Sequence, residues 1–308
     1  MRICLISNAR LPVRLYGGTE RIVQWLAQEY LRAGHEVTLV ARSGSRLAGV
    51  RFIPADSAAQ ALERLPADAD IYHFHAWPPP DDFPRPWLFT LHGNAAPGER
   101  LPARTIGISA DHARRHRLPV YVYNGVDPSE FEFRADKQDH LLFFSKVRRR
   151  VKGAARALRL ARANHLKLTV AGGYRLDLLK TGGLWDSLHP SIRFAGEVGG
   201  ARKARMLAEA SALLFPIAWD EPFGLVLVEA LISGTPVIAT PRGSVPELVP
   251  EGVGATFERD EDFPAALERV RQCRPGDCRD WAMEHFSSVA CARRHLGLYA
   301  RVLDRDVF

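Results

Sequence analysis

The sequence predicts an α/β protein with two doubly wound domains, each a parallel sheet wrapped by helices. Three observations carry this prediction. Short apolar, β-branched segments alternate with longer amphipathic ones, which is typical of strand–helix–strand units. The alternation starts afresh after a polar, turn-rich stretch at 127–140. The length of 308 residues suffices for two cores of ordinary size.

The first half supplies one run of strands and a well-marked helix. The expected strands are 2–7, 36–41, 50–53, 70–75, 87–92, 104–108 and 119–123. Residues 19–33 have apolar positions at helical spacing, and Gly34 follows as a stop signal. A helix between the first two strands predicts that they are parallel, with the helix as the crossover.

The second half repeats the pattern. The expected strands are 141–145, 166–170, 191–195, 212–217 and 236–239, and the expected helices are 153–164, 174–180, 200–210 and 224–232. Residues 277–305 read as two helices with no strand after them. We therefore predict domains at 1–135 and 136–287, with a closing helix at 288–308 that packs back on the first domain.

Composition narrows the class of protein. A hydrophobic content of 46% and a charged content of 25% are those of a soluble globular protein. No stretch of 18 apolar residues and no signal peptide are visible, so we expect a cytoplasmic protein without a transmembrane helix. The four cysteines form no zinc pattern, and His73 and His75 lack a third ligand, so we expect no metal.

The net charge of +7 comes from basic residues that are spread along the chain. This distribution disfavours nucleic acid, which would call for a massed basic patch. It suits phosphorylated ligands or peripheral contact with an anionic membrane, such as the inner surface of a cell membrane.

The segment 219–240, WDEPFGLVLVEALISGTPVIAT, is almost entirely apolar yet carries Glu221 and Glu229. A buried carboxylate is costly without a partner, so either a ligand or a structural ion pair must compensate. Pro222 and Gly224 predict a loop that ends in a helix start near Phe223 or Gly224. Glu221 would then lie at a helix N-terminus, whose free N–H groups bind phosphate or sugar hydroxyls.

Two common nucleotide-binding classes do not fit. A dehydrogenase would show an intact G-x-G-x-x-G, whereas the glycines at 17–18, 172–173 and 199–200 are pairs without the third. The P-loop motif of phosphate-transfer enzymes is also absent from the sequence.

An ordered set of motifs resembles one family. EPFGLVLVE, followed by ALISGTPVIATPRGSVPELV, resembles the E-x7-E motif of retaining glycosyltransferases of the GT-B fold, family GT4 (glycosyl transferases group 1). Further likenesses follow in family order: LPVRLYGGTERIV, TLHG, IGIS, VYNGVD, VKGAARAL, LTVAGG and FSSVACARRHLGLYARVL. The resemblance implies two Rossmann-like domains that face each other across a deep cleft, with the acceptor on the first and the donor on the second.

The resemblance also implies roles for single residues. The catalytic group would be Glu221, Lys152, His92 and Lys146, with Lys152 neutralising the donor diphosphate and His92 near the donor sugar. The donor-binding group would be Glu229 on the ribose hydroxyls, the N–H groups of Phe223, Gly224 and Leu225, Val198 on the base, and Gly17, Gly18 and Gly172. Where the family has Gly-Arg, this chain has Ser145-Lys146, which leaves Lys146 or Arg148 for the second phosphate contact.

The reaction that the resemblance implies is transfer of a sugar from a UDP- or GDP-sugar to the hydroxyl of an acceptor sugar, glycolipid or small molecule. It would retain the anomeric configuration and need neither metal nor cofactor. A sugar-nucleotide epimerase or phosphorylase of the same fold, or a non-catalytic sugar-nucleotide binding protein, remains the alternative. His75 is expected on the acceptor side.

Overall fold

The computed structural model describes residues 1–13 and 17–304 of the chain. It divides into two compact units. The first contains residues 1–127 together with the chain from Phe286 onward, and the second contains residues 128–285. The boundaries expected from the sequence were after residues 135 and 287.

The first unit contains a six-stranded parallel sheet in the order β3-β2-β1-β4-β5-β6. Its strands are β1 (Arg2–Ile6), β2 (Glu36–Ala41), β3 (Arg51–Pro54), β4 (Ile71–Phe74), β5 (Trp87–Thr90) and β6 (Thr105–Ile106). The inner strands are mostly apolar because helices cover both faces of such a sheet; β4 is buried at every position.

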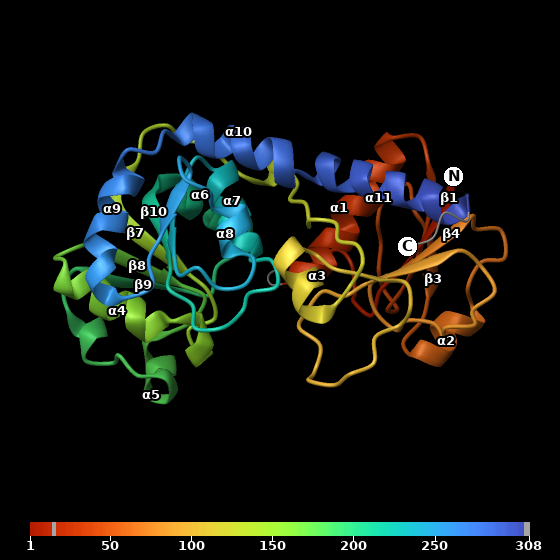
Figure 1. Ribbon diagram of the computed structural model, residues 1–308, viewed down its shortest axis with the longest axis horizontal. Coiled ribbons are helices and arrows are strands. Elements are labelled where there is room, and N and C mark those ends of the chain that lie inside the picture. Colours follow the sequence, from red (N-terminus) through yellow and green to blue (C-terminus); the bar gives the residue numbers. More distant parts are fainter. Residues whose placement is uncertain (14–16, 305–308) are drawn as a thin grey trace. The chain divides into compact units, whose positions relative to one another are not determined.

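Helices α1 (Gly18–Arg32), α2 (Ala58–Glu63), α3 (Ala110–His116) and α11 (Ser288–Leu303) belong to the first unit. The apolar positions of α1 recur at helical spacing and are buried, among them Trp25 and Tyr30. Helix α11 packs against α1, and the hydroxyls of Tyr30 and Tyr299 lie 2.9 Å apart (Figure 1). The last residues of the helix expected at 288–308, 305–308, lie outside the described residues.

The second unit contains another six-stranded parallel sheet, in the order β12-β11-β10-β7-β8-β9. Its strands are β7 (Gln138–Phe144), β8 (Leu168–Ala171), β9 (Ile192–Gly196), β10 (Ala210–Phe215), β11 (Val237–Ala239) and β12 (Gly254–Thr256). Its helices are α4 (Ala154–Ala163), α5 (Leu178–Thr181), α6 (Gly200–Glu209), α7 (Leu225–Ile232), α8 (Val245–Leu248) and α9 (Phe263–Arg271), and α10 (Pro275–Phe286) ends at the boundary. Side chains of β7, β8, α4 and α9 share one core.

Both sheets have the doubly wound strand order, so the predicted α/β fold class is confirmed. Chain connections run one way from β1 and the other way from β4, and the same reversal separates β7 from β10. Loops at the carboxyl ends of these adjacent strands diverge, and ligands of doubly wound sheets bind in the crevice between them.

Some elements differ from the sequence prediction. Residues 119–123 form only an isolated bridge, Gly107 to Tyr121, rather than a strand. The neighbouring strand β6 has just two residues and offers no longer partner. Helices α2, α3, α8 and α9 and strand β12 were not predicted, and β7 begins at Gln138, inside the expected linker.

Candidate functional site

The carboxyl edge of the second sheet brings together most of the expected site residues. Loops follow β7, β8, β9 and β10 at this edge because all four strands are parallel. These loops carry, in strand order, Lys146 and Lys152, Gly172, Val198, and Glu221 with Phe223 and Gly224. Strands β7 and β10 are neighbours, so Lys152 and Glu221 flank the switch point of the sheet.

Glu221 is nearly buried in the loop between β10 and α7. Its Oε2 atom lies 2.6 Å from Lys152 Nζ and accepts a hydrogen bond of 3.0 Å from Trp219 Nε1. The Glu221 backbone is also fixed, because Ser244 N donates to Glu221 O at 2.9 Å. Both side-chain contacts engage Oε2, so Oε1 takes no part in them.

Lys152 ends a 3-10 turn, Arg150–Lys152, directly before Gly153 and α4. Gly153 is required there: its φ is +80°, and a Cβ atom would lie 2.1 Å from Pro216 O. Burial lowers the pKa of Lys152, while the Glu221 carboxylate beside it opposes that shift.

Other cations lie near Lys152. The charges of Arg149 and Lys146 add to the lowering of its pKa, so both are close to the ammonium group. The Trp219 ring has Lys152 Nζ 4.4 Å and Arg149 Cζ 5.3 Å from its centroid. Arg148 is exposed.

Glu229 lies inside α7 and is 3% exposed. Its Oε1 atom is 2.5 Å from Lys203 Nζ, which reaches it from α6. Val198, in the turn between β9 and α6, is buried just before the helix that carries Lys203. The Glu229 carboxylate is thus held by a lysine from a neighbouring helix.

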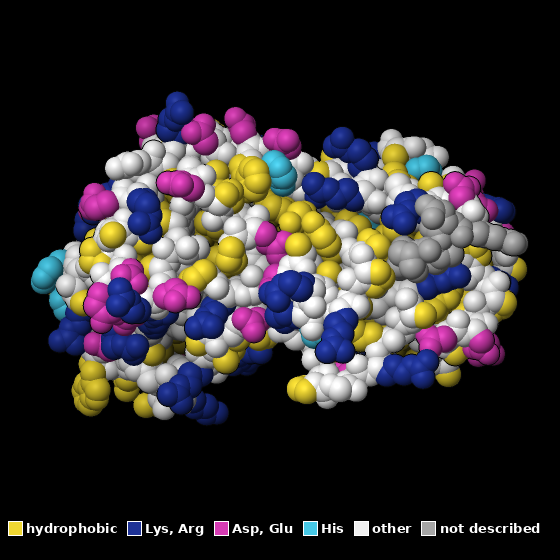
Figure 2. Space-filling model, viewed as in Figure 1, with side chains coloured by type: hydrophobic (Ala, Val, Ile, Leu, Met, Phe, Trp, Pro, Cys, Tyr) yellow, Lys and Arg dark blue, Asp and Glu magenta, His cyan; other side chains and the backbone are white. Residues whose placement is uncertain are grey.

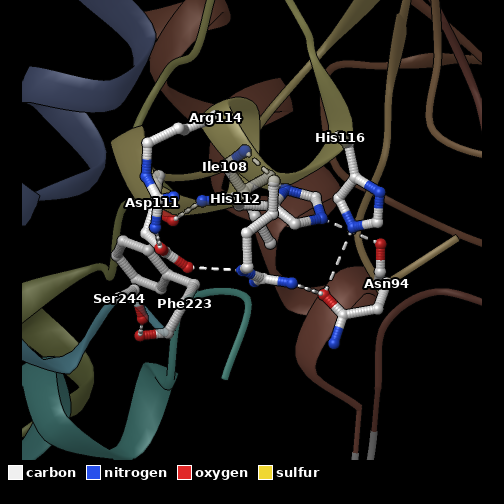
Figure 3. A network of polar contacts seen from close by, with 11 residues as sticks. Asn94, Ile108, Asp111, His112, Arg114, His116, Phe223 and Ser244 are labelled. Atoms are coloured by element: carbon white, nitrogen blue, oxygen red, sulfur yellow. Dashed lines mark hydrogen bonds and ion pairs between the residues drawn. The ribbon is translucent and has the colours of Figure 1, made fainter. Parts of the chain in front are cut away.

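The N-terminus of α7 begins at a glycine cap. Gly224 has φ +81°, a left-handed conformation that suits glycine, and the helix starts at Leu225, within two residues of the predicted start. Gly224 and Leu225 are partly exposed. The residue before the cap is fixed by its backbone: Phe223 O accepts a 2.8 Å hydrogen bond from Ser244 Oγ (Figure 3).

The sequence left two ways to compensate the carboxylates, a ligand or a structural ion pair. The structure has an ion pair at each: Lys152 pairs with Glu221, and Lys203 pairs with Glu229. Lys203, Arg149 and Trp219 were missed by the sequence interpretation. Trp219 directly precedes the motif and could have been noticed, whereas no pattern marks Lys203.

Gly172 shapes the turn after β8. Its φ is +95°, and a Cβ atom would lie 2.3 Å from Ser145 O, in the loop after β7. Gly172 O accepts a hydrogen bond from Val147 N at 3.1 Å. The glycine therefore lets the loops after β7 and β8 approach each other closely.

The remaining expected residues belong to the first unit. Gly17 directly precedes α1 and Gly18 is its first residue, so both follow β1 at the carboxyl edge of that sheet. A Cβ atom on Gly17 would lie 2.7 Å from Glu20 Oε2. Residues 14–16 of the preceding loop lie outside the described part of the chain.

His92 follows β5 and bonds to a second histidine. Its Nε2 atom lies 2.9 Å from His75 Nδ1, and the two rings are stacked. Burial lowers the pKa of His92 to about 3, so its imidazole is neutral near pH 7. His73 and His75 share one side of their strand, as expected, and His73 is bonded to Thr90 and Tyr299.

The loop after His92 is held by α3, a contact that the sequence did not indicate. His112 Nδ1 accepts from Ile108 N at 3.3 Å, so Nε2 carries the proton and donates to Gly93 O at 3.0 Å (Figure 3). Arg115 Nη1 donates to Asn94 Oδ1 at 2.9 Å. Two side chains of one helix thus hold the segment after His92, one through the Gly93 backbone and the other through the Asn94 side chain.

Within 1–13 and 17–304, no group of three or more His, Cys, Asp or Glu side chains is arranged to hold a metal ion. In the same part of the chain, no helix combines the length and the hydropathy that crossing a membrane requires.

The model of the family described as "Glycosyl transferases group 1" matches residues 126–282, just over half of the 308 residues. The chain belongs to this family. The match covers the second unit as far as Ala282, including Lys152, Glu221 and Glu229. The family prediction is confirmed at this level.

Relatives of this group 1 chain match over short segments. The D-inositol 3-phosphate glycosyltransferase of Streptomyces griseus is 39% identical over 79 residues, which are 26% of this chain and 16% of the relative. The phosphatidyl-myo-inositol mannosyltransferase of Mycobacterium leprae is 41% identical over 75 residues, 21% of this chain and 20% of the relative. The matches thus span at most a fifth of these curated relatives.

Solved structures match the group 1 chain over nearly its full length. AviGT4, a glycosyltransferase involved in avilamycin A biosynthesis, has a TM-score of 0.81 and 26% identity over 98% of both chains. Anabaena HepE, solved in complex with UDP-glucose, has a TM-score of 0.71 and 15% identity over 97% of this chain and 99% of its own. The latter likeness concerns the fold alone.

Proposed function

We propose that this protein transfers a sugar from a nucleoside diphosphate sugar, a UDP- or GDP-sugar, to an acceptor hydroxyl with retention of anomeric configuration. The observation that carries the proposal is the buried Lys152–Glu221 pair at the switch point of the second sheet. It places a cation and a carboxylate side by side where doubly wound folds bind nucleotides.

Lys152 would stabilise the departing diphosphate. A negative charge develops on the leaving oxygen as the bond to the sugar breaks, and a fixed cation in a nearly buried site lowers the energy of that state. Glu221 and Trp219 hold the ammonium group in place. Lys146 and Arg149 would add positive charge for the second phosphate.

The carboxylates would hold the polar groups of the donor. The Oε1 atom of Glu221 and the partly exposed N–H groups of Gly224 and Leu225 would contact the transferred sugar and the diphosphate. Glu229 Oε2, which the ion pair with Lys203 does not use, would accept hydrogen bonds from the ribose hydroxyls. Val198 would contact the base.

The reaction we propose has no protein nucleophile. The acceptor oxygen bonds to the anomeric carbon on the face from which the diphosphate leaves, and the acceptor proton passes to the departing phosphate oxygen. Lysine ammonium groups would supply the positive charge, so the proposed reaction needs neither metal nor cofactor. The acceptor is a sugar, glycolipid or small molecule with a free hydroxyl.

The comparisons support a sugar-nucleotide donor. AviGT4, similar over 98% of the chain, is a glycosyltransferase. The relatives that match over short segments are named as a D-inositol 3-phosphate glycosyltransferase and a phosphatidyl-myo-inositol mannosyltransferase. A chain of this fold, HepE, binds UDP-glucose.

A donor panel tests the proposal. Nucleoside diphosphate sugars are screened by thermal shift, since a ligand that binds the native state raises its apparent stability. The stabilising donor is then offered to a panel of acceptors, and the anomeric configuration of the product is read by NMR. Activity should survive a chelator.

Two variants locate the site. Glu229→Ala should weaken nucleotide binding, while Lys152→Ala should depress turnover strongly with the donor still bound. Wild-type transfer by both variants would disprove the assignment. Epimerised donor, or phosphate-dependent sugar release, would indicate the epimerase or phosphorylase instead, and donor binding without turnover would indicate a binding protein.

A further inference from the structure

The segment between β8 and β9 carries an unusual concentration of exposed hydrophobic side chains. Among the residues that the structure describes, ten large hydrophobic side chains are exposed, and five of them lie in residues 174–188. Trp185 is 81% exposed, Leu176 74% and Leu179 69%. We call the five side chains the apolar patch: Tyr174, Leu176, Leu179, Trp185 and Leu188.

The patch is held outward by a well-anchored backbone. Leu178 is buried in the core of the second unit, and Leu184 packs against the same core. Asp177 Oδ2 accepts a hydrogen bond from Tyr174 N at 2.8 Å and fixes the start of the segment. The segment therefore already packs two leucines, Leu178 and Leu184, against the core. The exposed leucines are not needed for that packing.

Figure 2 shows hydrophobic side chains at the lower left of the face, where α5 lies in Figure 1, with Lys or Arg side chains beside them. Contiguous exposed apolar surface on a folded protein marks an interaction site more often than scattered single residues do. The segment begins two residues after Gly172, but none of the five side chains belongs to the expected donor-binding group.

The charges around the patch favour an anionic partner. The acidic group of Asp186 is neutralised by Arg162 of α4 at 2.8 Å. Lys180 is exposed within the segment, and no ion pair involves it in the described part of the chain. Arg159, also exposed and without an ion pair there, lies one turn from Ala155 on α4, which contacts Gly183.

We propose that the apolar patch docks this protein on the surface of an anionic lipid bilayer. Trp and Leu side chains enter the boundary between headgroups and acyl chains, where tryptophan is enriched in membrane proteins. Lys180 and Arg159 contact the anionic headgroups, whose attraction for basic residues extends over about a Debye length. The whole-chain charge of +7 acts in the same direction.

A lipid surface fits the patch better than a protein partner. A stable protein interface takes roughly 20–30 residues from each side. The patch offers five side chains on short turns, with the exposed Lys180 and Arg159 beside them. A bilayer is fluid and needs no matching shape. The binding free energy from inserting a few apolar side chains adds to that from the attraction of basic residues to anionic lipids.

Vesicle co-sedimentation of the full chain tests the proposal, without donor or acceptor present. We expect binding to vesicles of phosphatidylcholine with phosphatidylglycerol, and weaker binding to phosphatidylcholine alone. The triple variant Leu176→Ser/Leu179→Ser/Trp185→Ser should bind the anionic vesicles at least about tenfold more weakly. The control Val289→Ser, which changes a 53% exposed valine of α11, should bind as wild type does.

Two further measurements separate the contribution of the basic residues from that of the inserted apolar side chains. Lys180→Glu should weaken binding to anionic vesicles only, and high salt should do the same. The fluorescence spectrum of Trp185→Phe is subtracted from that of wild type, and the difference reports on Trp185. This difference spectrum should shift to the blue when vesicles are added. This second reading keeps the test valid even where the triple variant does not fold.

Several results would overturn the proposal. Wild type that binds neither vesicle, or a triple variant that binds as wild type does, would show that the patch does not dock on lipid. A dimer that forms without lipid and is lost in the triple variant would assign the patch to a second copy. These vesicle experiments use no donor, so their outcome does not depend on whether the protein transfers a sugar.

Discussion

Lys152 Nζ lies 2.6 Å from Glu221 Oε2, and the two side chains are only 12% and 10% exposed. Each side chain of so poorly hydrated a pair depends on the other, because removing one partner leaves an uncompensated charge and destabilises the fold. At the same time the pair stands where a diphosphate would enter the site. The relationship therefore couples the stability of the second unit to the chemistry proposed for it.

Single and double substitutions of the pair should separate these two roles. Lys152→Met alone should lower the free energy of unfolding by about 3 kcal/mol, because Glu221 is left buried without its cation. The double variant Lys152→Met/Glu221→Gln should regain most of this stability but no transfer activity. Denaturant unfolding gives the first quantity and a transfer assay the second. Equal stability of the single and double variants would show that the uncompensated Glu221 carboxylate is not the cause of the loss.

Lys203 should position Glu229 for the nucleotide. Lys203→Met removes the cation 2.5 Å from Glu229 Oε1, so the carboxylate loses its fixed orientation. We expect nucleoside diphosphate to bind about tenfold more weakly, which corresponds to 1.4 kcal/mol. Titration calorimetry measures this, and Lys203→Arg should restore part of the affinity.

The matched control for Lys203 is a surface lysine of the same unit. Lys167 pairs with Asp139 at 3.1 Å, but the two side chains are 66% and 92% exposed. Exposed pairs contribute little, so Lys167→Met should leave nucleotide affinity unchanged. Affinity that falls equally in both variants would point to long-range charge rather than to positioning by Lys203.

Gly243 should be sensitive because the Glu221 backbone lies against it. Its φ is +61°, and a Cβ atom would lie 2.3 Å from Glu221 O and 2.4 Å from Glu221 N. Gly252 also has positive φ, at +94°, but nothing lies within 4 Å of its Cβ position. Gly252→Ala should therefore cost only the left-handed conformation, about 1 kcal/mol.

Gly243→Ala should cost at least about 1 kcal/mol more than Gly252→Ala, since the backbone beside it must move. It should also slow transfer, because that movement displaces Glu221. Thermal unfolding and initial rates of the two alanine variants, compared side by side, check this. A Gly243→Ala protein as active as Gly252→Ala would mean that the Glu221 loop adapts without loss.

The fold could be predicted from the sequence because its signals are local. Alternating strands and helices fix a parallel sheet, and the helix 19–33 differs from α1 by one residue at each end. The position of α7 followed from Pro222 and Gly224 for the same reason. Residues 119–123 were misread because strand formation depends on a partner, and β6 is too short to provide one.

The candidate site was only partly predictable. Its carboxylates were visible as charges in an apolar segment, but the partner of Glu229 was not. Lys203 lies 26 positions away, on a helix whose orientation depends on packing between α6 and α7. The contact of His112 with Gly93 likewise joins residues 19 positions apart through the fold. Such pairs are set by tertiary packing, which a single sequence does not report.

The buried histidines of the first unit should make its stability fall in acid. Burial lowers the pKa of His295 to about 4 and that of His112 to about 4, against a usual value near 6.5. Between these values the unfolded chain binds more protons than the folded one. The free energy of unfolding therefore decreases as the pH falls from about 6.5 toward 4.

His295 allows this pH dependence to be assigned. Its Nδ1 atom lies 3.1 Å from Cys291 O, one turn earlier in α11, and an amide nitrogen can make the same contact without titrating. For a shift of this size, linkage gives about 2 kcal/mol of stability lost by wild type between pH 7 and pH 5 from this one residue. His295→Asn should lose correspondingly less over that interval, whatever its stability at pH 7. Denaturant unfolding at the two pH values measures the difference, and equal losses in the two proteins would show that His295 takes up its proton without unfolding.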